Sequence, residues 1–238
     1  MKLRYMAAAA VLISAAVLAP GATASAASSG CPAVSNSIWA GYAVCARNYT
    51  YIGAVWTVPA AHGGGNKISA DWVGLGGLGT GVPLEQEGTV SNVSSGKALY
   101  YAWWEHVCKK CSRNAVHLNV KKYPVRTGDV MVASIAVTHG DRYDFKVTDE
   151  GRRGDHYRWY FSTIKTFRKE NHKSAEVIVE DPFEAPLTHF GKITFTQVTA
   201  NNNVMGVYTP QKFTLPDGKV SVSDIGQTAE FSVTFKHD

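Results

Sequence analysis

The stretch "KSAEVIVEDP", residues 173–182, alternates apolar and acidic side chains as a β-strand does. Successive side chains of a strand point to opposite faces, so Val177 and Val179 belong to one face and Glu176 and Glu180 to the other. One face of this strand is therefore apolar, and the other carries two carboxylates. Taken alone, the segment is explained most simply by a sheet face exposed to solvent, because charged residues are mostly exposed.

The rest of the chain repeats this short, β-rich pattern. Runs rich in Val, Ile, Thr, Tyr, Phe and Trp are separated by Gly, Pro, Asn and Asp, and no sustained apolar repeat at helical spacing follows residue 26. Regularly spaced short strands of this kind predict an antiparallel all-β sandwich. The expected strands cover residues 39–44, 51–58, 69–74, 99–106, 115–121, 130–137, 142–149, 157–162, 175–180, 192–199 and 230–235.

The N-terminus has the features of a secretory signal peptide. Lys2 and Arg4 precede an apolar run at residues 7–18, and small residues suited to cleavage follow the run. The run is too short to favour a membrane span. We therefore expect residues 1–26 to be removed and residues 27–238 to form a single domain that is secreted to the extracellular space, with no membrane anchor.

The charge balance argues against a nucleic-acid partner. The formal net charge is +5 over 238 residues, and Lys2 and Arg4 of the expected signal peptide contribute to it. Basic side chains gather in the middle of the chain, but a solvated face explains them, and the sequence holds no recognisable nucleic-acid module. We expect no nucleic acid among the partners.

Four cysteines, an even number in an exported chain, predict two disulfides. Three pairings are possible, and proximity along the chain favours Cys31 with Cys45 and Cys108 with Cys111. The alternative, a redox or zinc motif at residues 108–111, lacks a surrounding βαβ pattern and a second pair of ligands. The histidines also show no metal-ligand spacing, so we expect neither a metal nor another cofactor.

Two further segments bear on function through the same alternation. In "LYYAWWEH", residues 99–106, Trp103 and Glu105 share one face, and both faces carry large aromatic side chains. One face can fill a core, whereas the other is suited to a groove or a partner surface. In "PLEQEGT", residues 83–89, Gln86 points away from its two glutamate neighbours.

Taken together, these segments are similar to the glutamic peptidases, also called eqolisins. The resemblance extends over about residues 35–182, and it rests on several motifs in the family's order rather than on one alone. The motifs are SNSIWAGYA (35–43), DWVGLGG (71–77) followed by LEQEGT (84–89), YYAWWEH (100–106), TGDVMVASI (127–135) and SAEVIVEDP (174–182).

This resemblance implies a concanavalin-like sandwich of two bent antiparallel sheets, with a Gln and a Glu as the catalytic pair on a concave face. By motif position the pair is Gln86 and Glu176. Trp72, Trp103 and Glu105 fall where the family lines its substrate groove. The expected activity is that of an endopeptidase at acidic pH, acting on a polypeptide substrate as a monomer.

The residue types suit peptide hydrolysis in themselves. Hydrolysis needs a base that takes a proton from water, a donor that stabilises the oxyanion, and an acid that protonates the departing amine. The Glu176 carboxyl can fill the first and third roles in turn. The Gln86 amide can donate to the oxyanion without changing its charge. Burial against Trp72 or Trp103 would raise the pKa of a groove carboxyl.

The chain also departs from the family pattern. Ile38 stands where the family usually has Asn, Val177 where an aromatic residue is common, and Gly76 and Val90 where acid-adapted members carry aspartates. These changes leave the central pair in place but remove groove carboxylates. We therefore expect a pH optimum shifted toward mild acidity.

Two other functions fit the same pattern. A glycoside hydrolase could use Glu105 with Glu176, or Glu176 with Glu180, as its paired carboxylates, and it would not depend on Gln86. A non-catalytic, lectin-like or peptide-binding module could use Trp72 and Trp103 as stacking platforms, and it would keep its ligand when Glu176 is replaced.

Overall fold

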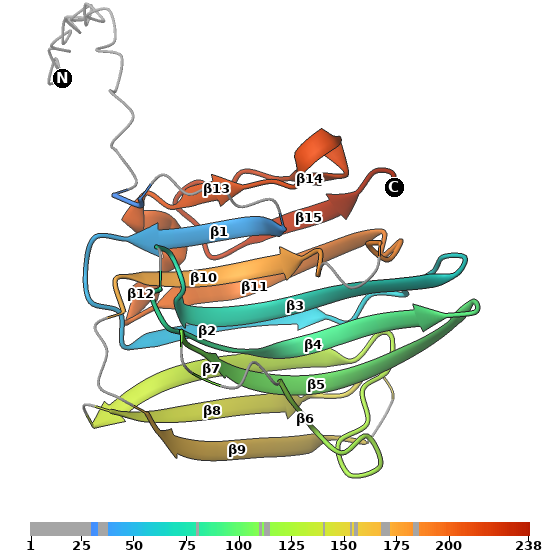
Figure 1. Ribbon diagram of the computed structural model, residues 1–238, viewed down its shortest axis with the longest axis horizontal. Helices are drawn as coiled ribbons and strands as arrows, with labels where there is room; N and C mark the ends of the chain where they lie inside the picture. Colours follow the sequence, from blue (N-terminus) through green and yellow to red (C-terminus); the bar gives the residue numbers. More distant parts are fainter. Residues whose placement is uncertain are drawn as a thin grey trace, which may run out of the picture.

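The computed structural model describes residues 30–32, 38–79, 81–109, 111, 115–139, 141–152, 154, 157–167, 172–182 and 186–238. The described chain forms two stacked antiparallel β-sheets, which lie one behind the other in Figure 1. The predicted all-β sandwich is therefore confirmed. The expected signal peptide, residues 1–26, lies outside the described residues, and no helix among them is long and apolar enough to cross a membrane.

The first sheet has seven strands. In spatial order they are β13 (Gln211–Phe213), β1 (Trp39–Cys45), β10 (Ser174–Glu180), β3 (Asn66–Gly76), β4 (Leu84–Ser94), β5 (Lys97–Val107) and β6 (Val116–His117).

The second sheet runs in the order β14 (Val220–Val222), β15 (Phe231–Phe235), β11 (Lys192–Ala200), β2 (Tyr51–Thr57), β7 (Val130–His139), β8 (Arg142–Asp149) and β9 (Trp159–Thr166), with β12 (Asn203–Val204) paired to β11. Two short 3-10 helices, η1 (Met205–Tyr208) and η2 (Pro216–Gly218), complete the fold.

The main core lies between the sheets. Val177 and Val179 of β10 belong to this core, as their alternation with the glutamates predicted, and Ile135 and Phe195 face them from the second sheet. Each such buried side chain stabilises the fold by roughly 1.5–3 kcal/mol. With one face of β10 fixed in the core, the period of two fixes Glu176 on the opposite face of the first sheet.

That opposite face of the first sheet has an apolar cluster of its own. Trp39, Trp72, Trp103, Ile178 and Phe213 are all buried there. The rings of Trp39 and Trp72 meet edge to face with their centroids 5.0 Å apart. The first sheet is thus covered by apolar side chains on both faces, and the outer cluster forms the floor of the candidate site.

Most of the expected strands are present, but the strand at residues 115–121 is wrong. Only Val116 and His117 pair with β5. The reason is local, because the Asn119 side chain accepts hydrogen bonds from the backbone N–H groups of Lys121 and Lys122 and turns the chain. The short strands β12, β13 and β14 were not predicted, and β4 was recognised only through its alternating side chains.

The structure confirms the disulfides that sequence proximity favoured. Cys31 is bonded to Cys45 at the end of β1, and Cys108 is bonded to Cys111 just beyond β5. The first bond ties the segment before β1 to the first sheet. The second closes a short loop at the end of the strand that carries Glu105.

Candidate active site

Strand register places the two predicted catalytic side chains in one row across the first sheet. Glu176 of β10 pairs with Gly74 of β3, Gly74 pairs with Gln86 of β4, and Gln86 pairs with Glu105 of β5. Residues directly opposite each other in a sheet point to the same face. The side chains of Glu176, Gln86 and Glu105 therefore emerge together beside the tryptophan cluster.

Gly74 lies between Glu176 and Gln86 in this row, and its lack of a side chain makes room for the side chains of neighbouring residues. A Cβ atom at this position would lie 2.8 Å from Trp72 Cζ3 and 2.9 Å from Leu84 Cδ1, so neighbouring side chains already use the space that it would need. Adjacent strands are about 4.8 Å apart, which puts the backbones of β10 and β4 about 10 Å apart.

Glu176 is a buried carboxyl, and no positive charge among the described residues contributes to its pKa. Its side chain is 0% exposed, and neither oxygen has a hydrogen-bond partner among the described residues. Burial raises the pKa of Glu176 well above 4.5; the nearby Ser174 hydroxyl opposes this shift and the charge of Glu85 adds to it. The Ser174 hydroxyl donates instead to the backbone oxygen of Gly76, at 3.0 Å. The Glu176 carboxyl therefore keeps its proton at pH values at which an exposed glutamate is already ionised.

Gln86 is held by one of its two amide hydrogens. Its Nε2 donates to Glu105 Oε2 at 3.0 Å, while its Oε1 is buried without a hydrogen-bond partner in the described part of the chain. The amide nitrogen carries two N–H groups, so one remains after Glu105 is satisfied. The arrangement orients the amide and leaves both a donor and an acceptor for a ligand.

The next row of the sheet carries the predicted tryptophans. Ile178 pairs with Trp72, Trp72 with Gly88, and Gly88 with Trp103. Trp72 Nε1 donates to Glu180 Oε2 at 2.7 Å, which fixes the plane of the indole. The structure therefore places Trp72 and Trp103 on the same face as Gln86 and Glu176, one row along the strands.

A small cavity lies on the other side of the Glu176 row. It has a volume of about 260 Å³ and shares Ser174 with the strand that carries Glu176. Its described lining consists of Gly30, Pro32, Cys45, Ala46, Leu78, Lys173 and Ser174.

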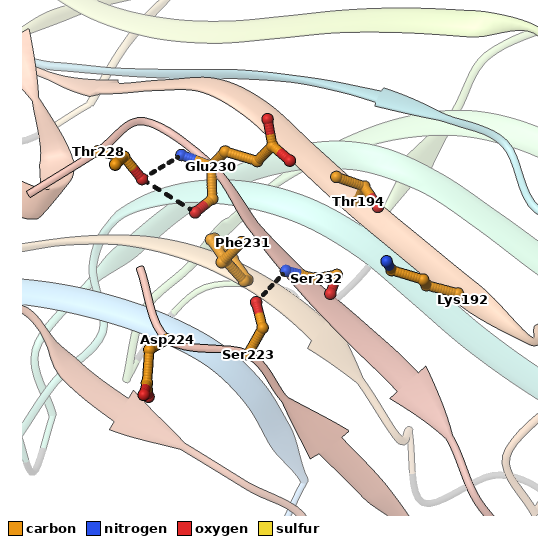
Figure 2. Close-up of a pocket in the computed structure, with 8 residues that line it drawn as sticks. All are labelled: Lys192, Thr194, Ser223, Asp224, Thr228, Glu230, Phe231 and Ser232. Atoms are coloured by element: carbon orange, nitrogen blue, oxygen red, sulfur yellow. Dashed lines mark hydrogen bonds between the residues drawn. The ribbon is translucent and has the colours of Figure 1, made fainter. Parts of the chain in front are cut away.

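A second, polar depression of about 340 Å³ lies on the second sheet (Figure 2). Lys192 and Thr194 of β11 line it together with residues on and beside β15. None of the predicted site residues contributes to it.

Sequence reasoning assigned no role to three acids on the core side of the first sheet. Asp71, Glu85 and Glu87 are buried, although they lie on strands β3 and β4 next to the candidate site. Glu87 Oε1 accepts hydrogen bonds from the backbone N–H groups of Ser134 and Lys146. The alternation around Gln86 already placed both glutamates on this face, but it did not show that the face is buried.

One grouping of metal-ligand atoms occurs among the described residues. Ligand atoms of His106, Cys108 and Cys111 lie within 4.8 Å of one another. The two sulfur atoms are joined in a disulfide, and His106 Nδ1 is hydrogen-bonded to Glu85. The two sulfur atoms are therefore already engaged.

Several solved structures share this fold. A scytalido-glutamic peptidase bound to a transition-state analogue inhibitor matches with a TM-score of 0.67 and 18% identity, over 84% of this chain and 98% of that one. SCP-B, an eqolisin in complex with the tripeptide Ala-Ile-His, matches with a TM-score of 0.63 and 19% identity over the same shares. Aspergilloglutamic peptidase from Aspergillus niger gives 0.51 and 20%, over 71% of this chain and 99% of that one.

Sequence comparison establishes the family itself. No curated protein sequence matches the chain significantly. The sequence model of the Peptidase A4 family matches residues 37–231, which include every residue of the Glu176 row. The chain therefore belongs to the peptidase A4 family, the glutamic peptidases that its motifs indicated.

Proposed function

We propose that the chain is a secreted endopeptidase in which Glu176 and Gln86 act as a catalytic pair on a water molecule and a peptide bond. One observation carries this proposal: the two side chains lie on one face of the sheet, on either side of Gly74. No other described pair of a buried, uncompensated carboxyl and a half-satisfied amide is arranged in this way.

Each residue has a defined role in the proposed reaction. Ionised Glu176 takes a proton from the water that attacks the peptide carbonyl, and the protonated carboxyl then gives a proton to the departing amine. The second N–H of Gln86 donates to the oxyanion. Glu105 accepts the first N–H and so positions the amide.

The rows on either side of the pair would hold the polypeptide. Trp72, Trp103 and Ile178 offer an apolar floor for side chains on one side of the cut bond. The cavity beside Ser174 offers space on the other side. Secretion is supported by the two disulfides, because such bonds persist in oxidising compartments.

Replacing Gln86 tests the amide's role. We expect Gln86→Ala to lower kcat by about 10²- to 10³-fold, because a preorganised oxyanion donor is lost. Gln86→Glu should be nearly as inactive, since a carboxylate cannot donate and repels the oxyanion. Cleavage of denatured casein from pH 2 to 7 measures this effect. A glycoside hydrolase would instead keep full turnover of a polysaccharide in Gln86→Ala, and that result would overturn the proposal.

The pH profile tests the base. Burial raises the pKa of Glu176, so the ionised base accumulates only as the pH rises above 4.5. We therefore expect kcat/KM to fall on the acid side with an apparent pKa above 4.5, which gives a mildly acidic optimum. Initial rates on a short fluorogenic peptide measure the profile. A rate that keeps rising below pH 3 would contradict this assignment.

A further inference from the structure

A buried carboxylate lies between two imidazoles on the back of the catalytic row. Glu85 is 0% exposed; its Oε1 lies 2.7 Å from His106 Nδ1, and its Oε2 is hydrogen-bonded to His172 Nε2. The three side chains come from β4, from β5 and from the segment just before β10. We name this group the His-Glu-His cluster.

Each member of the cluster borders a residue of the candidate site in sequence. Glu85 precedes Gln86, His106 follows Glu105, and His172 stands four residues before Glu176. Glu85 and His106 also face each other across β4 and β5, directly beside the Gln86–Glu105 pair. On the core side of the first sheet, the cluster therefore links β4, β5 and the segment before β10 by hydrogen bonds. The catalytic pair lies on the opposite face of the same sheet.

Aromatic rings enclose the cluster. The His106 ring stacks on Phe167 with centroids 3.9 Å apart and planes at 8°, and the His172 ring meets Tyr143 edge to face at 5.4 Å. Rings packed in this way restrict the motion of both imidazoles. Further titratable side chains buried on the core side of the two sheets include Tyr42, Tyr49, Asp71, Glu87 and Tyr143.

The charges on the two faces of the sheet are linked. Burial would raise the pKa of Glu85, but the hydrogen bonds and positive charges of His106 and His172 outweigh it and leave this pKa lowered. The Glu85 charge in turn contributes to the raised pKa of Glu176. One carboxyl thus stays ionised in acid, while the other, across the same sheet, holds its proton.

We propose that Glu85, held between His106 and His172, is a positioning residue for the catalytic pair, which clamps the strand of Gln86 to the segment leading into Glu176 and sets the acid limit of activity. The inference rests on the proposed peptidase function.

The variant Glu85→Gln tests the clamp through the pH profile. It removes the negative charge behind Glu176, so the acid limb of kcat/KM should move to lower pH by on the order of half a unit to one unit. Loosened positioning should lower kcat on the order of tenfold with a smaller change in KM. Glu87→Gln is the matched control, because Glu87 lies on the same face of the same strand but bonds to backbone N–H groups rather than imidazoles. It should leave the acid limb in place.

Thermal stability, which can be measured without enzymatic activity, separates this inference from the peptidase proposal. Because the folded-state pKa of Glu85 is lowered, its stabilising effect is complete above pH 4.5 and is lost as the pH falls through the lowered value. Glu85→Gln should therefore melt on the order of 5 °C below wild type near pH 6, with a smaller deficit in stronger acid. This comparison tests the clamp even if casein is not cleaved.

A second variant covers the case in which Glu85→Gln does not fold. His106→Gln removes the partly exposed imidazole, whose side chain is 13% exposed, and leaves Glu85 less compensated. Its acid limb should move to higher pH, opposite to Glu85→Gln, and a general loss of structure would not produce such a change of sign. An unchanged acid limb in a folded Glu85→Gln or His106→Gln, or an equal shift in Glu87→Gln, overturns the proposal.

Discussion

The variant Glu176→Gln is expected to lower kcat/KM on denatured casein by at least about 10³-fold, because no other described group on the Glu176 row can act as both base and acid. Glu105 shares the row, but its carboxylate accepts the hydrogen bond from Gln86. Activity is measured at the wild-type optimum. Glu230→Gln is the control, because Glu230 is an exposed glutamate just before β15 on the second sheet.

The same variant should gain stability while it loses activity. The folded-state pKa of Glu176 is raised, so wild type loses stability as the pH rises from 4.5 toward that raised value. Glutamine carries no charge and avoids this loss, so Glu176→Gln should unfold at higher urea concentration than wild type near pH 7. Residual activity within tenfold of wild type would remove Glu176 from the reaction. If Glu176→Gln lost stability together with activity, Glu176 would have a structural role instead.

The alternation of side chains made much of the fold predictable. On β10 the valines face the core and Glu176 faces outward, because a period of two leaves only these assignments once one face is apolar. On β5 the same reasoning separated Trp103 from Trp104. The strand expected at 115–121 failed because Asn119 bends the chain through its own side chain, a local hydrogen bond that composition does not reveal.

The candidate site was predictable only in part. Motif order indicated Gln86 and Glu176, but the register that puts both on one row with Gly74 depends on how β10 pairs with β3, which no local pattern fixes. The partners of Glu85 were even harder to predict from the sequence, since His172 is 87 residues away along the chain. The simpler interpretation of Glu176 as a solvent-exposed side chain is wrong, because this residue is fully buried.

A second large effect is expected at Asp71, on the core side of the first sheet. It is a buried carboxyl on the core side of β3, paired across the strands with Val179 and Thr89. The Thr89 hydroxyl already accepts a hydrogen bond from Trp56 Nε1, and neither Asp71 oxygen has a partner among the described residues. Burial raises the pKa of Asp71 from 3.8 to about 8.

This shift makes stability fall with pH. The folded chain keeps a proton on Asp71 that the unfolded chain releases above pH 3.8, so the free energy of unfolding decreases between pH 3.8 and about 8. At pH 7 the loss amounts to about 4 kcal/mol, from about 1.36 kcal/mol per pKa unit. Asp71→Asn keeps the shape and stays neutral. It should therefore match wild type near pH 4 and exceed it by about 4 kcal/mol near pH 7.

Urea unfolding at pH 4, 6 and 8, with extrapolation to water, measures this difference. Asp144→Asn is the matched control, because Asp144 is also buried but is paired with Lys146 at 2.6 Å and accepts from Ser162. Removing that paired charge should lower stability rather than raise it. A gain of the same size for Asp71→Asn at pH 4 and pH 8 would show that packing, and not the proton held by Asp71, is responsible.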